Sequence, residues 1–276
     1  MNTFFIKIAS RIRQALQKRG SIYFSFVDVV FKYPWLCLFN AVLKSEARLH
    51  NRAIIHVIGD SHLLPFVFRK PFLLHHISQA TAYNLNKDRS FSQSKRYLNS
   101  FLSAIDKHRD VLLLVFGEID ARVHIYLQYK KNKKKISISR LIGVTVDRYG
   151  ETIKRLKAEG FVVSVHGLPP AARKDFESDL PFLGSPEQRS RISREFNNKL
   201  GQFCRKNMIS FIDMQSIAAD ENGFIKKEYA ADDVHLNDKI VPFVRDRIAD
   251  AFGDSRNFHW GFGTNGLTKT VLPTKV

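Results

Sequence analysis

Three side chains in this sequence have the types needed for nucleophilic catalysis, although they stand far apart along the chain. Ser61 directly follows the apolar run of residues 54–58 and Gly59-Asp60, and His235 closes the sequence Asp232-Asp233-Val234-His235. A serine hydroxyl is a weak nucleophile until a neighbouring base removes its proton. A carboxylate three residues before a histidine can accept the Nδ1–H and hold the ring in one tautomer. These residues predict Ser61 as nucleophile, His235 as base and Asp232 as orienting carboxylate.

The elements around these residues are expected to bring them to one edge of a sheet. Residues 54–58 are apolar and mostly β-branched, which predicts a buried strand, and Gly59 marks a sharp turn at its end. Open α/β sheets place their chemistry outside the carboxyl ends of the strands. Helical patterns alternate with further apolar runs, which predicts a three-layer α/β/α sandwich with a central, mainly parallel sheet. The expected strands cover 72–77, 111–116, 161–166 and 209–213. A helix is expected to begin over residues 63–69, and the main expected helices cover 138–159, 187–206 and 240–252.

The two blocks together resemble a known family. Gly59-Asp60-Ser61, followed far downstream by Asp232-x-x-His235, is similar to the first and last blocks of the SGNH/GDSL hydrolase superfamily, and the resemblance spans residues 52–252. It implies a flavodoxin-like sandwich in which the serine attacks an ester carbonyl while histidine and aspartate come from one C-terminal loop. It implies no metal and no cofactor.

The resemblance also implies an oxyanion hole, and here the sequence departs from the family. The family places a glycine about where Ser78 stands, and its third block usually reads Gly-x-Asn-Asp with the asparagine as a donor. This chain has Gly117-Glu118-Ile119-Asp120, and Ile119 cannot donate a hydrogen bond. Loss of one such donor costs roughly 10²- to 10³-fold in rate in other enzymes. The sequence therefore resembles a divergent branch with Gly-Glu-Ile-Asp and an arginine, here Arg122, two positions later.

Two interpretations of this third block stay open from the sequence. In one, Arg122 or His124 supplies positive charge at the catalytic mouth, with Glu118 and Asp120 fixing it. In the other, the same residues form a structural ion pair at the end of a strand. A second histidine at a strand end, His166, is a rival base, but no acidic residue stands three positions before it.

Composition limits the partners without choosing among them. Lys and Arg total 44 against 26 Asp and Glu, a formal charge of +18 over 276 residues. Such an excess favours an anionic membrane, an acidic glycan or nucleic acid. Nucleic acid is not favoured, because no zinc spacing, helix-turn-helix or aromatic RNA motif accompanies the charge. Cys37 and Cys204 suit no metal spacing and are interpreted as buried thiols in a reducing compartment.

Three regions are expected along the chain. Residues 1–50 form a basic and apolar extension, 51–252 the hydrolase-like domain, and 253–276 a tail. Residues 1–19 have the pattern of a basic helix in a membrane interface, or of a helical layer packed on the domain. The apolar run that follows contains charged residues and a proline, so it does not predict a spanning helix. The expected location is the cytoplasm, with peripheral attachment to the inner face of the membrane. The lysine-rich residues 130–135 predict a solvated loop.

These inferences predict a serine-dependent esterase or an O-acyltransferase, including an acetyltransferase. The expected substrate is an acylated glycan, such as a cell-envelope or capsular polysaccharide, or another small ester. Water as acceptor makes an esterase and a sugar hydroxyl makes a transferase, and one acyl-enzyme serves both. The alternative is a catalytically silent carbohydrate-binding or scaffold protein on the same fold.

Overall fold

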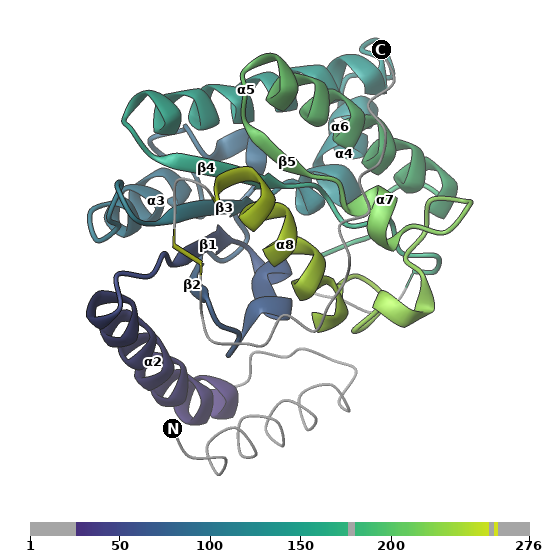
Figure 1. Ribbon diagram of the computed structural model, residues 1–276. Coiled ribbons are helices and arrows are strands. Elements are labelled where there is room, and N and C mark those ends of the chain that lie inside the picture. Colours follow the sequence, from purple (N-terminus) through teal and green to yellow (C-terminus); the bar gives the residue numbers. More distant parts are fainter. Residues whose placement is uncertain (1–25, 176–179, 254–256, 259–276) are drawn as a thin grey trace, which may run out of the picture.

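The computed structural model describes residues 26–175, 180–253 and 257–258, with residues 26–34 as backbone alone (Figure 1). The predicted helix over residues 1–19 and most of the predicted C-terminal tail lie outside this part of the chain, so both stay predictions. Among the described residues, no helix is both long enough and apolar enough to cross a membrane.

The centre of the protein is a parallel sheet of five strands in the order β2-β1-β3-β4-β5. This is the flavodoxin-like order, in which the strand order reverses between β1 and β3. The sequence predicted every one of these strands to within a few residues. The strands are β1 (Ile55–Gly59), β2 (Phe72–His76), β3 (Val111–Val115), β4 (Val162–His166) and β5 (Ser210–Ile212).

The register aligns the carboxyl ends of the inner strands. Gly59 at the end of β1 pairs with His76 of β2 on one side and with Val115 of β3 on the other. Val115 in turn pairs with His166 at the end of β4. The loops that follow these strands therefore leave the sheet side by side, and the loop after β1 leaves it at the switch point.

Helices cover both faces of the sheet, as the predicted three-layer sandwich requires (Figure 1). Side chains of β3 alternate between two separate apolar clusters, so this central strand is buried on both faces. One cluster includes residues of α3 (Ser94–Leu102), α4 (Ile125–Lys131), α5 (Ile138–Ala158) and α6 (Pro186–Lys206). The other includes residues of β5, α7 (Met214–Ala218) and α8 (Val241–Phe252).

The segment between β1 and β2 differs from the expectation. A helix was expected to begin near Leu63, but the chain forms a short 3₁₀ turn over Ser61–Phe66. Pro65 lies inside this turn, and β2 begins at Phe72, so the short connection has no room for a full crossover helix. The lysine-rich residues 130–135 are largely exposed at the turn between α4 and α5, in agreement with the predicted solvated loop.

An N-terminal helix, α2 (Phe26–Leu49), packs beside the edge of the sheet (Figure 1). Leu43 and Ala47 are fully buried against Ile54 and Leu73. The prediction of two buried thiols is half wrong, because Cys204 is buried but Cys37 is exposed. The buried positions of α2 are spaced four residues apart, and Cys37 does not fall on that stripe.

Candidate active site

Ser61 is positioned by the tight end of β1. A Cβ atom on Gly59 would lie 2.4 Å from the carbonyl oxygen of Val115, so only glycine lets β1 and β3 approach this closely. The Asp60 carboxylate then caps the 3₁₀ turn, since its Oδ1 accepts a hydrogen bond of 2.9 Å from the backbone N–H of His62. Ser61 is the first residue of that turn and stands just past the carboxyl end of the strand.

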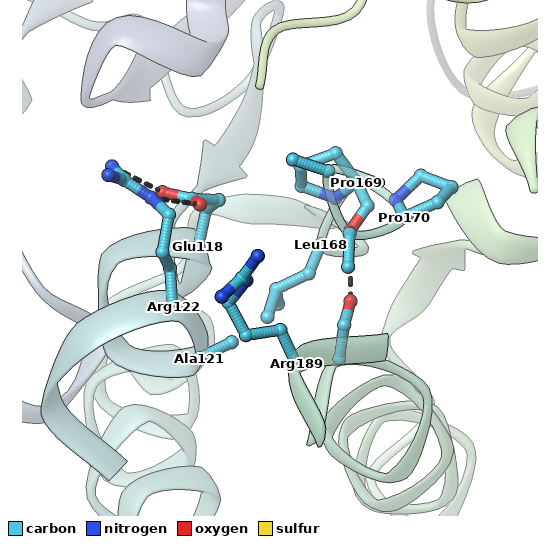
Figure 2. A pocket seen from close by; sticks show the side chains of 10 residues that line it. Glu118, Ala121, Arg122, Leu168, Pro169, Pro170 and Arg189 are labelled. Carbon is cyan, nitrogen blue, oxygen red and sulfur yellow. Dashed lines mark hydrogen bonds and ion pairs between the residues drawn. The ribbon is translucent and has the colours of Figure 1, made fainter. Parts of the chain in front are cut away.

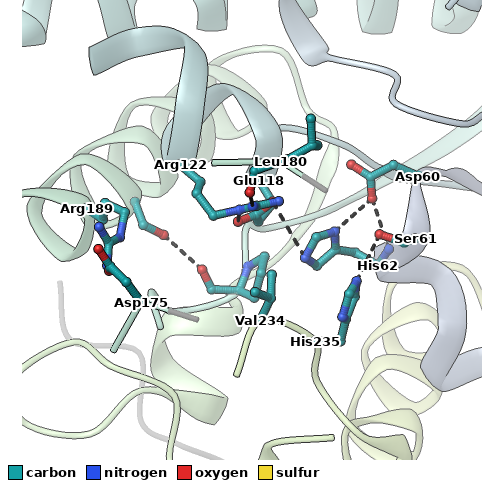
Figure 3. A network of polar contacts seen from close by, with 12 residues as sticks. Asp60, Ser61, His62, Glu118, Arg122, Asp175, Leu180, Arg189, Val234 and His235 are labelled. Carbon is teal, nitrogen blue, oxygen red and sulfur yellow. Dashed lines mark hydrogen bonds and ion pairs between the residues drawn. The ribbon is translucent and has the colours of Figure 1, made fainter. Parts of the chain in front are cut away.

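The fold brings together the three residues that the sequence predicted to act as a unit, and Figure 3 shows Ser61 next to His235. Ser61 Oγ lies 2.9 Å from His235 Nε2, although the two residues are 174 positions apart. His235 Nδ1 lies 2.9 Å from Asp232 Oδ2 and 3.1 Å from Oδ1. With Nδ1 as donor to the carboxylate, Nε2 is free to accept the serine proton, and the separation is within proton-transfer reach.

The loop that carries the histidine is folded around its own carboxylate. Asp232 Oδ1 accepts backbone N–H groups from Val234 at 2.8 Å and from His235 at 2.7 Å. Burial raises the pKa of Asp232, but hydrogen bonds and charge from His235 and the backbone donors outweigh burial and lower it to about 2. Asp232 is therefore ionised at neutral pH. Asp233, the neighbouring carboxylate, is exposed.

A second carboxylate–imidazole chain lies beneath this triad (Figure 3). His62 Nδ1 is 2.8 Å from Asp60 Oδ1, and His62 Nε2 is 3.9 Å from Glu118 Oε2. The ring of His62 packs against that of His235, with centroids 4.7 Å apart. Burial opposes protonation of His62, yet the charges of Asp60 and Glu118 raise its pKa. The pKa of Asp60 is lowered, because the charge and hydrogen bonds of His62 outweigh burial.

Arg122 continues this chain away from the triad. Its Nε and Nη2 donate to the two oxygens of Glu118 at 2.6 and 3.2 Å, and its Nη1 donates to the carbonyl of Leu180 at 2.9 Å. The guanidinium is thus committed to a bidentate ion pair, the geometry of the structural interpretation. Burial lowers the pKa of His124, the other residue considered as a source of positive charge.

Asp120 serves a different segment from the one expected. Its carboxylate accepts the backbone N–H of Ala82 at 2.7 Å and of Tyr83 at 3.3 Å, and it tethers the chain after β2 to the end of β3. It begins a π-helical turn, Asp120–His124, which directs it away from Arg122. Complete burial outweighs these two donors and raises the pKa of Asp120 to about 7.

The residues predicted around the oxyanion lie at the same edge. The backbone N–H of Ile77 donates to the Gly59 carbonyl at 2.8 Å, which places the exposed turn at Ser78 beside the end of β1. The positive φ that a glycine would adopt, +52°, belongs to the next residue, Gln79. Gly117 has φ +115° where the chain leaves β3, and Ile119 is buried at 5% exposure.

A small cavity lies between the ends of β3 and β4 (Figure 2). It measures about 20 Å³, which is room for roughly one water molecule. Its polar walls are Glu118, Arg122 and Arg189, and the ring of Phe182 lies 5.0 Å from the Arg122 guanidinium carbon and 4.9 Å from that of Arg189. The cavity is too small for a sugar or an acyl chain.

Comparisons with known proteins find similarity among solved structures. No family model and no curated protein matches the chain. Among solved structures, it is similar to a GDSL-like lipase from Bacteroides thetaiotaomicron, with 15% identity, 81% of this chain and 98% of that one covered, and a TM-score of 0.49. An acetyl xylan esterase is 18% identical, with 72% and 99% covered and a TM-score of 0.43. A psychrotrophic esterase from a Pseudoalteromonas species is 14% identical, with 73% and 97% covered and a TM-score of 0.38.

The first of these neighbours is named as a GDSL-like lipase, the class that the sequence motifs resemble.

The position of His166, the rival base in the sequence, keeps it away from the serine. His166 is fully enclosed at the end of β4, and burial lowers its pKa to about 4. Both of its ring nitrogens are buried without a hydrogen-bond partner, so within the described chain it contacts no nucleophile. No group of three or more His, Cys, Asp or Glu in that same part of the chain could hold a metal ion.

Sequence reasoning missed the pair Asp60–His62. The signal was present, because an acid and a histidine two residues apart flank the serine itself. The contact depends on the 3₁₀ turn and on the capping hydrogen bond, which fold the His62 ring back onto the Asp60 carboxylate.

Proposed function

We propose that the chain is a serine-dependent esterase or O-acyltransferase that acts on an O-acyl ester. The observation that carries the proposal is the hydrogen-bonded series Ser61 Oγ, His235 Nε2, His235 Nδ1 and Asp232, with each contact near 3 Å. Nucleophile, base and orienting acid in this order are the requirement for acyl transfer by serine. Residues 51–252 would form the catalytic domain.

In the proposed reaction, Ser61 Oγ attacks the ester carbonyl as its proton passes to His235 Nε2. Asp232 stays ionised and stabilises the imidazolium, in keeping with its lowered pKa. The tetrahedral intermediate collapses, the C–O bond to the leaving group breaks, and His235 returns the proton to the departing oxygen. Water or a sugar hydroxyl, deprotonated by His235, then attacks the acyl-enzyme and releases Ser61.

The oxyanion in this scheme is held by backbone donors. We assign the N–H of Ser61 and a donor from the turn at Ser78 to this role, with Gly117 shaping the opposite wall. Ile119 contributes no donor, so a modest rate is expected. Glu118, Asp120 and Arg122 act on the site indirectly: Glu118 and Arg122 support His62 beneath the triad, and Asp120 ties residues 82–83 to the end of β3.

A fluorophosphonate probe tests the proposal directly. Such a probe phosphonylates a serine only when its hydroxyl is activated. We expect covalent labelling of the parent protein at Ser61, detected by intact mass and peptide mapping, and none of the Ser61→Ala variant. Ser216→Ala serves as a matched control, because its hydroxyl bonds only locally, to the Asp213 carbonyl at 2.8 Å, and should leave labelling unchanged. A parent protein that stays unlabelled contradicts an activated serine.

The second candidate is a catalytically silent carbohydrate-binding or scaffold protein. It is favoured by one observation, the apolar Ile119 where the resembled family carries an oxyanion donor. Glycan binding by a parent protein that neither labels nor turns over any ester would favour it.

A further inference from the structure

A groove of about 470 Å³ lies at the carboxyl end of β2, the strand that pairs with β1, on the far side of β1 from the small cavity of Figure 2. We name it the β2–α3 groove. It begins at the end of β2, where Ile77 donates to the carbonyl of Gly59, two residues before Ser61. Its volume is within the usual range for a small-ligand site. Its lining residues are His76, Ile77, Ser78, Gln79, Phe91, Ser92, Gln93 and Tyr97.

The lining carries no formally charged side chain. Amides and hydroxyls supply the polar groups, and each of them can both donate and accept hydrogen bonds. The only titratable groups in the wall are Tyr97 and His76, and burial lowers the pKa of His76, with the Asp60 charge opposing that shift. No Lys or Arg lines the groove, and the nearby Arg96 donates through Nη1 to Gln93 Oε1 at 3.3 Å, so the wall itself favours a neutral ligand over an anion.

Aromatic rings at the rim face solvent. Phe91 is 94% exposed and Tyr97 is 48% exposed. The Tyr97 ring stacks near Phe101, with centroids 6.5 Å apart and planes 27° apart, which holds it in place. The Phe91 and Tyr97 rings at the mouth of the groove offer an apolar surface against which a ligand can pack.

The two groove amides occupy unusual backbone positions. Gln79 has φ +52° and Gln93 has φ +47°, a region that side chains other than glycine rarely adopt. Glycine would fit both positions with less strain, so the glutamine side chains are present at a conformational cost. Amide groups at both positions and aromatic rings at the rim match a pyranose, which has hydroxyls around its edge and an apolar C–H face.

We propose that the β2–α3 groove binds a neutral sugar residue next to the acylated one, so that the substrate class of Ser61 is an O-acylated neutral glycan. This rests on the proposed function for its chemistry but on the groove alone for binding.

Binding is measured first, without any need for catalysis. Ser61→Ala protein is titrated calorimetrically with unacylated cellohexaose, xylohexaose and maltohexaose, and with oligogalacturonate as an anionic counterpart. We expect at least one neutral oligosaccharide to bind, and Phe91→Ala or Gln93→Ala in the same background to weaken it roughly tenfold. Leu49→Ala, at another largely exposed apolar residue at the end of α2, is the matched control and should bind as the parent does. Binding of oligogalacturonate alone, or of no oligosaccharide, overturns the proposal.

Turnover provides the second measurement. In the parent background, Phe91→Ala should lower kcat/KM for both substrates. The fold-decrease for an acetylated neutral oligosaccharide should be roughly ten times the fold-decrease for p-nitrophenyl acetate. A loss confined to p-nitrophenyl dodecanoate would assign the groove to an acyl chain and overturn the sugar assignment. The two proposals can fail separately. Sugar binding without fluorophosphonate labelling would contradict the proposed serine-dependent activity, and labelling without sugar binding would contradict the proposed sugar site in the β2–α3 groove.

Discussion

Two aspartate–histidine pairs lie at opposite ends of the sheet. Asp232 and His235 stand beyond the carboxyl ends of the strands, with Oδ2 and Nδ1 2.9 Å apart. Asp110 directly precedes β3, and its Oδ2 is 3.2 Å from Nε2 of His56 near the start of β1. Side-chain exposure is 15% for His235 and 19% for Asp232, but 2% for each member of the second pair. The same two groups are therefore partly open at one end and sealed at the other.

The far nitrogen of each ring explains what each pair does. For His235 it meets a hydroxyl, Ser61 Oγ, at 2.9 Å. For His56 it meets another imidazole, His75 Nε2, at 2.8 Å. Sharing a proton between two imidazoles generates no nucleophile. Removing the proton from the serine hydroxyl does generate one. An Asp–His pair becomes a catalytic device only when the third group is a nucleophile that substrate can reach.

The charges differ as well. Asp110 also binds Arg109 through Nε at 2.9 Å and Nη2 at 3.1 Å, so a permanent cation balances it. Its pKa falls to about 2 because hydrogen bonds from His56, Arg109 and the backbone outweigh burial. Burial lowers the pKa of His56 itself. The carboxylate of Asp232 instead has His235 as its titratable partner, so its charge is available when the ring becomes protonated.

Replacing the histidine of each pair should show the largest difference between the two pairs, in activity for one and in stability for the other. His235→Ala is expected to lower kcat by roughly 10⁵- to 10⁶-fold with little change in Tm, because the base is lost from a partly exposed site. His56→Gln should retain most activity but lose about 1–3 kcal/mol of stability, since it disrupts buried hydrogen bonds. Initial-rate kinetics and thermal unfolding of both variants check this. Equal effects on activity would erase the contrast.

The carboxylates provide a finer comparison. Asp232→Asn should lower kcat by about 10⁴-fold, because an amide no longer holds the ring in the tautomer that accepts the serine proton. Asp110→Asn should lower the free energy of unfolding by about 1–3 kcal/mol, because the Arg109 ion pair and the His56 bond are weakened. Turnover of a small acetate ester and urea unfolding distinguish the two. A stable Asp110→Asn protein with little activity would contradict the assignment.

His75, which contacts His56 of the buried pair, predicts how stability depends on pH. Burial, together with the charges of His56 and Lys44, lowers the pKa of His75 from 6.5 to about 3. Between these values the unfolded chain binds a proton that the folded chain does not, so this group destabilises the fold progressively as pH falls from 6.5 to about 3 and has no effect above 6.5. The fall in Tm from pH 7 to pH 4 should therefore be smaller in His75→Phe than in the parent. Parallel Tm profiles would count against it.

Arg122→Lys should have a small effect on turnover. Lysine cannot reproduce the bidentate contact with Glu118 and the bond to the Leu180 carbonyl, so Arg122→Lys is expected to lower Tm by a few degrees. Because the guanidinium acts on the triad only through Glu118 and His62, kcat should fall by less than roughly tenfold. A loss near 10³-fold with an unchanged Tm would instead favour Arg122 as a direct source of charge for the oxyanion.

The sequence by itself determined the sheet and its chemistry-bearing edge. Apolar runs of strand length alternate with segments of helical periodicity, and this pattern favours a parallel sheet covered by helices on both faces. Gly59 at the end of the first run predicted a turn there. Asp232 and His235 were predictable as a pair because a spacing of three within one loop limits their separation. The missed 3₁₀ turn after β1 and the exposed Cys37 depended on connection length and helix orientation, which local patterns do not specify.

Only the tertiary structure decided which histidine meets a nucleophile. His62 and His235 take their carboxylates from their own segments, but His56 meets Asp110 and His235 meets Ser61 from distant parts of the chain. Contacts of that kind depend on strand register and on the direction in which a turn sends each side chain, and neither is encoded in residue spacing. For the same reason, the sugar-sized groove between β2 and α3 had no signature in the sequence.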